Sequence, residues 1–197
     1  MYLLNNNRNG RYNYRQPIKQ QSVMMPIQHV PSQFKKENEI VVPKPRVKEM
    51  LWGEPTWLLF HTLAEKVKEE EFPNIRQEFL NQIMKICNNL PCPTCAQHAT
   101  RYMNGVNFNN IQTKEQLKLF LFSFHNEVNR RKDYERFNVN DLSKYRNAVT
   151  VNVVRNFFYH FSKRSYNVRM AVDNVHRHKM LKEFRAWLEK NVYNFYE

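Results

Sequence analysis

The chain has 197 residues, a length that suits one domain of ordinary size or a smaller domain with extensions. Its three glycines are too few for the many two-residue turns of an all-β protein, so the composition favours helices. The net charge of +13 lies almost entirely in residues 1–50 and 141–197, while residues 51–140 are nearly neutral. Acidic partners, nucleic acid among them, would therefore meet the flanks of the chain.

Residues 1–50 are rich in Asn, Gln, Pro, Lys and Arg and show no hydrophobic period, which predicts a basic and mostly disordered arm. The first residues do not form a cationic stretch followed by an apolar run, as a secretory signal would. No segment approaches the roughly 20 apolar residues that cross a bilayer. We therefore expect a protein that is not secreted and has no membrane span.

Four helices are expected between residues 54 and 131, because apolar residues recur there at steps of three and four. Pro73 and Pro93 suit the first turns of the second and third helices, and Thr113 with Gln116 has the pattern of a capping box. Short loops between the helices favour a bundle, so the expected fold is all-α with a four-helix core. The expected ranges are about 54–67, 74–87, 93–104 and 114–131.

Residues 141–197 are expected to form a basic, helical C-terminal extension. Apolar residues at helical spacing in 151–161 and 181–192 predict two further helices there, packed on the bundle or on a partner chain. A set of basic residues could form a face for nucleic acid or an acidic partner, although such a set is usually a solvated surface. Its members are Arg164, Arg169, Arg177, His178 and Lys179.

Two cysteines two residues apart, Cys92 and Cys95, stand at the start of the third predicted helix. Free N–H groups at a helix start stabilise a thiolate and lower its pKa, as thiol–disulfide exchange requires. The same spacing also occurs in zinc sites. Cys87, Cys92, Cys95 and His98 could together supply three sulfurs and one nitrogen, although Cys87 falls on an apolar helix stripe.

Polar side chains also flank the apolar stripe of the fourth predicted helix. His125 and Asn129 are one turn apart, and Asn126 is adjacent. Buried imidazole and amide groups need hydrogen-bond partners, so this cluster indicates a polar ligand inside the bundle. A solvated helix end is the alternative. His98, one turn after Cys95, either contacts a cofactor or lies on the surface.

Three groups of residues, in this order and spacing, resemble the Erv/ALR family of FAD-linked sulfhydryl oxidases over about residues 51–140. The first is Trp52-Gly53 with Trp57 and His61, the second Cys92-x-x-Cys95-x-x-His98, and the third His125-Asn126-x-Val128-Asn129. The resemblance implies a helical bundle that holds FAD, is usually homodimeric and has no metal. It assigns FAD contact to Trp52, Gly53, Trp57, His61, His98, His125, Asn126, Val128, Asn129 and Lys132.

The resemblance also implies a division of work between the two cysteines. Cys92 would exchange disulfides with a protein dithiol substrate, and Cys95 would lie against the isoalloxazine and form a thiolate–flavin charge-transfer complex. Reduced flavin would then pass two electrons to O2, giving hydrogen peroxide. The alternative from another class of function is a zinc-stabilised basic binding module without catalysis.

The sequence departs from the cellular members of that family in lacking two cysteine pairs. Phe122 and Val139 replace a structural disulfide, so core packing would substitute for it, and there is no shuttle pair outside the core. Cys87 is expected to be a buried helix residue. A single active disulfide without a shuttle pair, together with the contexts Leu90-Pro91-Cys92 and Phe124-His125-Asn126, is most similar to the forms of large cytoplasmic DNA viruses. This similarity implies disulfide formation in virion proteins, in the host cytoplasm or the virion, with a partner such as a thioredoxin-like protein.

Overall fold

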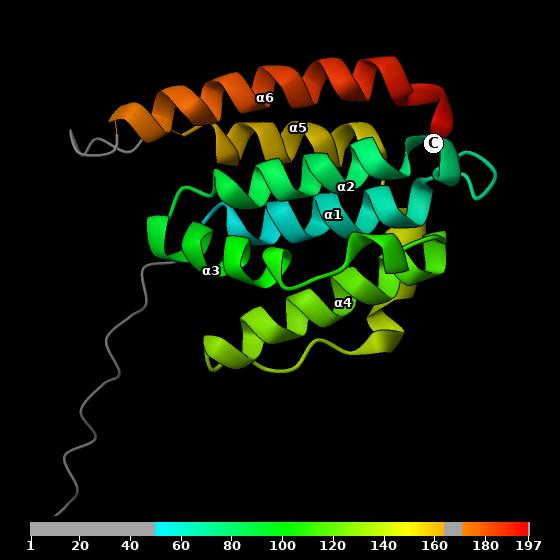
Figure 1. Ribbon diagram of the computed structural model, residues 1–197, viewed down its shortest axis with the longest axis horizontal. Coiled ribbons are helices and arrows are strands. Elements are labelled where there is room, and N and C mark those ends of the chain that lie inside the picture. The colour runs from blue at the N-terminus through cyan, green and yellow to red at the C-terminus, as the bar shows by residue number, and fades with distance from the viewer. Residues whose placement is uncertain (1–49, 164–170, 197) are drawn as a thin grey trace, which may run out of the picture. The chain divides into compact units, whose positions relative to one another are not determined.

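The computed structural model describes residues 50–163 and 171–196, so the predicted arm lies outside it except for Met50. All regular structure in these residues is helical, which confirms the all-α prediction; the one β-bridge joins Val67 to Phe195. No helix in these residues has the length and apolarity to cross a membrane. In chain order (Figure 1), the elements are α1 (Gly53–Lys66), α2 (Phe72–Asn88), α3 (Pro93–Asn104), η1 (Phe108–Asn110), α4 (Lys114–Arg131), η2 (Val139–Asn147), α5 (Thr150–Phe161), α6 (Ala171–Asn191) and η4 (Val192–Asn194).

The expected helix starts are present. The side chain of Cys92 caps α3 and Pro93 occupies the first turn, while Pro73 does the same in α2. At the start of α4, the N–H of Gln116 donates to the Thr113 hydroxyl at 3.2 Å, and the N–H of Thr113 donates to the Gln116 side chain at 3.1 Å. This reciprocal pair is the predicted capping box, and it fixes where α4 begins.

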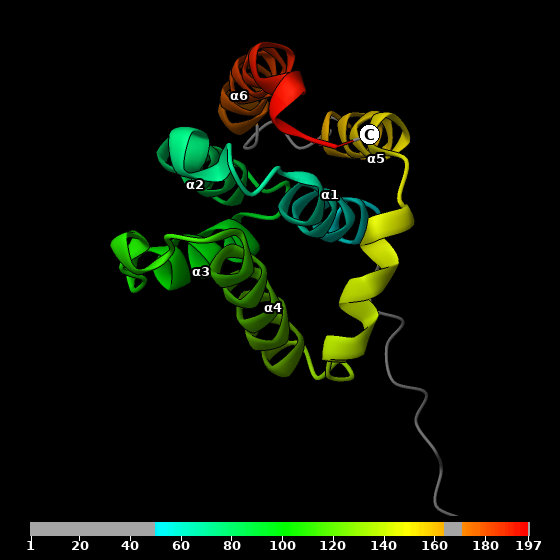
Figure 2. The same cartoon turned by 90° about the vertical axis from the view of Figure 1, so that its right-hand side faces the viewer.

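Helix α1 lies at the centre of the described fold. It packs against α4 on one side, α5 on another and η2 on a third (Figure 2), while α2 packs against α3 and α6. Leu59, Leu63 and Ala64 of α1 are therefore buried in the shared core. A helix surrounded in this way positions side chains for several neighbours at once.

The polar stretch after α4 contains an element that the sequence did not predict. Residues Val139–Asn147 form η2, a run of 3-10 turns whose start is capped by the Asn138 side chain. Short 3-10 segments have no long hydrophobic period, so periodicity does not reveal them. Tyr145 is the buried residue of η2, and it faces α1.

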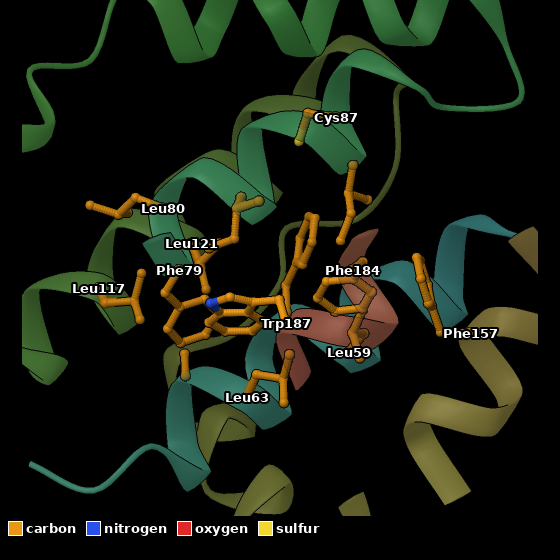
Figure 3. Packing of buried hydrophobic residues seen from close by; sticks show 14 of the residues in the cluster. Leu59, Leu63, Phe79, Leu80, Cys87, Leu117, Leu121, Phe157, Phe184 and Trp187 are labelled. Atoms are coloured by element: carbon orange, nitrogen blue, oxygen red, sulfur yellow. The ribbon is translucent and has the colours of Figure 1, made fainter. Parts of the chain in front are cut away.

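The C-terminal helices pack on the bundle, which was one of the two expected outcomes. Phe157 of α5 and Phe184 of α6 are almost fully buried, and their ring centroids lie 5.8 Å apart. Figure 3 shows Phe184 and Trp187 among buried residues of the preceding helices, with the ring of Phe79 beside Trp187 at 5.4 Å. The described residues before and after residue 140 thus share one core, and a domain boundary at 140 remains a prediction.

Candidate active site

A cavity of about 660 Å³ opens where the start of α1, the start of α3 and the ends of α4 and α5 come together, a size in the range of small-molecule sites. Its walls include Trp57 from α1, Cys95 from α3 and His125 from α4. In Figure 1 these helix ends lie at the left-hand side of the bundle. Four sequentially distant segments therefore contribute to one site.

The two neighbouring cysteines hold different positions at this cavity. Cys95 lines it, whereas Cys92 is the N-cap of α3 and its sulfur accepts the backbone N–H of Cys95 at 3.2 Å. Both cysteines are half-buried free thiols. One sulfur therefore faces the cavity, and the other lies at the entrance of the helix.

The pKa of the Cys95 thiol is raised to about 11, which corrects the expectation that a helix start would lower it. Burial of the thiol is the largest cause, and its hydrogen bond with Cys92 adds to the effect. The cations of Lys132 and Arg131 act in the opposite direction. The helix N–H group is directed at Cys92 and not at Cys95, so it does not offset the burial.

A stack of rings from α1, α4 and η2 forms the next layer of the site. The Nε2 of His61 lies 3.1 Å from the Nδ1 of His125. Trp57 stacks on His125 with centroids 4.1 Å apart and planes 9° from parallel, and Tyr145 stacks on His61 at 4.8 Å. These contacts fix both imidazole planes.

Both imidazoles are neutral at pH 7. Burial lowers the pKa of His61 to about 3, with His125 and Lys144 adding to the effect. Burial, followed by the charge of Lys144, lowers the pKa of His125 to about 4. In the His61–His125 hydrogen bond, one neutral ring donates its N–H and the other accepts. The pair therefore provides hydrogen bonding without charge.

The two asparagines of α4 hold the loop that follows this helix. The carboxamide of Asn126 accepts the N–H of Phe137 at 2.8 Å and donates to the carbonyl of Phe137 at 3.2 Å. Asn129 donates to the carbonyl of Glu135 at 2.9 Å. The ring of Phe137 is thereby placed on His125, with centroids 4.6 Å apart. These amide groups give the cavity wall its shape.

The structure brings most of the predicted cofactor residues together, although it does not test their contact with FAD. His61 stands behind the wall, one hydrogen bond from His125. Asn126 and His98 are not part of the wall, and the Nδ1 of His98 is buried without a hydrogen-bond partner among the described residues. Those that line the cavity are Trp52, Gly53, Trp57, His125, Val128, Asn129 and Lys132.

Sequence reasoning missed other lining residues, among them Phe137, Lys144, Tyr145, Asn156 and His160. Phe137 and Tyr145 were detectable as aromatic residues within a polar stretch. Phe137 also packs on Phe122, at 5.9 Å between centroids, and the substitution of packing for a disulfide at Phe122 stays a prediction. Val139, at the other missing cysteine position, is instead 51% exposed.

The structure does not assemble the four ligands of the zinc alternative. Cys87 is 1% exposed within the core, and burial raises the pKa of its thiol far above the usual range. In the part of the chain that the structure describes, no three His, Cys, Asp or Glu side chains are grouped as a metal site would need.

The predicted basic face needs one correction. Arg177 is 3% exposed, and its Nε donates to the carbonyl of Asn89 at 3.1 Å, so it belongs to the interior. His178 and Lys179 are exposed, while Arg164 and Arg169 lie outside the described residues. Nucleic-acid binding remains a prediction.

The fold and the site define an all-helical domain in which two neighbouring cysteines stand at the edge of a cavity lined by aromatic rings. Residues 54–148 match the model of the Erv1 / Alr family. The family whose model matches this segment is the one that the motifs indicated.

Viral proteins are among the relatives of this chain. One relative is protein 096R of Invertebrate iridescent virus 3, whose name contains the words FAD-linked sulfhydryl oxidase. It is 35% identical over 82 residues, which are 41% of this chain. The chain spans 55% of that relative's length. The FAD-linked sulfhydryl oxidase of an African swine fever virus isolate from Kenya is 27% identical over 112 residues, which are 55% of this chain and 87% of the relative. No solved structure gave a significant match.

Proposed function

We propose that this protein is an FAD-dependent sulfhydryl oxidase that forms disulfides in protein substrates. The observation that carries the proposal is the position of Cys95, which lines a cavity together with Trp57, His125 and Asn129. The names of the viral relatives and the family of residues 54–148 support the same activity.

The residues of the cavity fit FAD. Planar rings such as Trp57 and Tyr145 line it, as a flat heterocycle requires. Three cations, Arg131, Lys132 and Lys144, line the same cavity with one carboxylate, Glu54. This excess of positive charge suits the two negative phosphates of FAD. The neutral imidazole of His125 adds a hydrogen-bonding group to the wall.

The first half of the reaction is disulfide exchange at the outer sulfur. A substrate thiolate attacks the Sγ of Cys92 in the Cys92–Cys95 disulfide, so a mixed disulfide forms and the bonding electron pair leaves on Cys95. A second substrate thiolate then attacks the substrate sulfur of the mixed disulfide and releases Cys92. The substrate leaves as a disulfide, and the enzyme retains two electrons as a dithiol.

The second half removes those two electrons. The chemistry that FAD supplies when bound is acceptance of the electron pair from the dithiol and its transfer to O2, giving hydrogen peroxide. Cys95 is the inner sulfur because it lies in the cavity wall. Lys132 and Arg131 favour its thiolate and so oppose the effect of burial. Without these cations, Cys95 would be a poorer leaving group in the first half.

Substrates and assembly follow as further parts of this proposal. Without cysteines outside residues 87–95, the chain has no internal shuttle, so a protein dithiol must reach Cys92 directly. We propose a viral protein that acts on virion proteins, through a thioredoxin-like or other dithiol partner, and that forms a homodimer. The viral sources of the relatives support this origin.

The test is to prepare the full chain with FAD supplied and to follow flavin absorbance, oxygen consumption and peroxide with a dithiol. We expect wild-type protein and Cys87→Ala, the matched cysteine control, to retain FAD and to turn over. Cys95→Ser should abolish reduction of the flavin by dithiol, and Cys92→Ser should slow it strongly. Wild-type protein that never retains FAD would refute the proposal, as would unimpaired oxygen consumption by Cys95→Ser.

A further inference from the structure

Helix α5 lies beyond residues 54–148, the segment that matches the family, yet it reaches the cavity. Asn156 and His160 of α5 both line the cavity. They are four residues apart, so they share one face of the helix. The site therefore has a wall that the family motifs do not include.

The orientation of α5 is fixed by its apolar residues. Val153, Phe157 and Phe161 are buried in the core, and α5 packs against α1. This burial holds the adjacent polar edge of the helix, with Asn156 and His160, at the cavity. Rotation of α5 that removed this edge from the cavity would also expose two buried phenylalanine rings, which is costly.

The imidazole of His160 has an unfulfilled hydrogen-bonding group. Its Nδ1 is buried and has no partner among the described residues. Tyr159 contacts the ring edge-on at 4.9 Å between centroids, a contact that does not satisfy a ring nitrogen. Buried polar atoms are nearly always hydrogen-bonded, so an unpartnered nitrogen on a side chain that lines a cavity indicates that a ligand supplies the partner.

We propose that α5 completes the FAD site, with the imidazole of His160 and the carboxamide of Asn156 forming hydrogen bonds to polar groups of FAD. This inference rests on the proposed function. The C-terminal region then belongs to the cofactor site itself, in addition to its part in the core. His160 and Asn156 are binding residues, and they take no part in the exchange at Cys92.

The test measures FAD affinity of the full-length protein by titration of FAD into flavin-free material, followed by flavin fluorescence. His160→Phe keeps the ring and removes its hydrogen bond, and Asn156→Leu does the same for the amide. We expect each to weaken FAD binding about threefold to tenfold, as the loss of one hydrogen bond implies. His160→Asn keeps a polar atom near the position of Nδ1 and should bind nearly as the wild type does.

His178→Phe is the matched control, because His178 is an exposed histidine on α6. It should bind FAD as tightly as the wild type. Wild-type affinity in both His160→Phe and Asn156→Leu would overturn the inference, and so would equal losses in His160→Asn and His160→Phe. If His160→Phe does not fold, Asn156→Leu and His160→Asn decide by the same criteria. Failure of the wild type itself to bind FAD would instead refute the proposed function.

Discussion

The carboxamide of Asn126 accepts the backbone N–H of Phe137, eleven residues further along the chain, and donates to the carbonyl of the same residue. These two hydrogen bonds hold the segment that follows α4 against the side of that helix. The ring of Phe137 then lies 4.6 Å from His125 and 5.3 Å from His61, between centroids. A residue outside the cavity wall thus places the ring of Phe137 against two imidazoles.

Asn126→Ala should lower the free energy of unfolding by about 1–3 kcal/mol, because two partly buried backbone groups lose their partner. Asn126→Asp should lower the free energy of unfolding by less, since it keeps the acceptor for the N–H of Phe137. Denaturant unfolding of the flavin-free protein measures both. Asn129→Ala, which removes one exposed hydrogen bond to Glu135, is the control and should lose least. Equal stability of all variants would show that the loop is not held in this way.

Lys132→Met should raise the pKa of Cys95, because the Lys132 cation favours the thiolate. Residue-resolved alkylation of the reduced protein as a function of pH measures the shift, and the midpoint for Cys95 should move upward. Lys85→Met is the control, since Lys85 pairs with Glu183 on α6 at 2.8 Å. An unchanged midpoint in Lys132→Met would contradict the role given to this cation.

The neutral histidine pair makes stability depend on pH. His61 and His125 have pKa values of about 3 and about 4 in the folded protein, below the usual histidine value of 6.5. Between these values the unfolded chain binds protons that the folded protein does not, so stability should fall as pH falls from about 6.5 to 4. Denaturant midpoints measured over this range give the slope.

His61→Gln should make that slope shallower, because it removes one of the two groups. Exposed His178→Gln is the control and should leave the slope close to that of the wild type. The comparison uses slopes, so a uniform loss of packing in His61→Gln does not affect it. Identical slopes in the wild type and His61→Gln would exclude His61 as a source of the dependence.

Arg177→Leu should destabilise the protein by about 1–3 kcal/mol, because it leaves the partly buried carbonyl of Asn89 without its donor. It should also speed alkylation of Cys92, which follows Asn89 by three residues in a loop that Arg177 helps to hold. Lys182→Leu, an exposed change on α6, is the control. If the two variants have the same stability and the same alkylation rate of Cys92, Arg177 does not hold the loop between Asn89 and Cys92.

The helices of the first part of the chain could be predicted closely from the sequence. The third and fourth expected ranges, 93–104 and 114–131, match α3 and α4, because a first-turn proline and a capping box act locally. The second range differs from α2 by only one or two residues at each end. Local chemistry determines these boundaries, so a single sequence contains the information.

The remaining parts of the site depend on contacts between distant segments. Phe137 is placed by Asn126, and Tyr145 is buried against α1 by a short 3-10 segment without periodicity. The same limit explains Arg177, which in the sequence looks like one more surface cation. The pKa of Cys95 also depends on its burial, which the helix start alone does not show.

The antiparallel bridge between Val67 and Phe195 makes detachment of α6 detectable at a distant part of the chain. The amide of Lys68 donates to the carbonyl of Asn194 at 2.9 Å, and that of Tyr196 donates to the carbonyl of Lys66 at 2.7 Å. Neither bond can survive if the last helix detaches. Deuterium uptake at these two amides should therefore rise together whenever α6 leaves the bundle, so a single peptide near Lys68 would report on an event more than a hundred residues away.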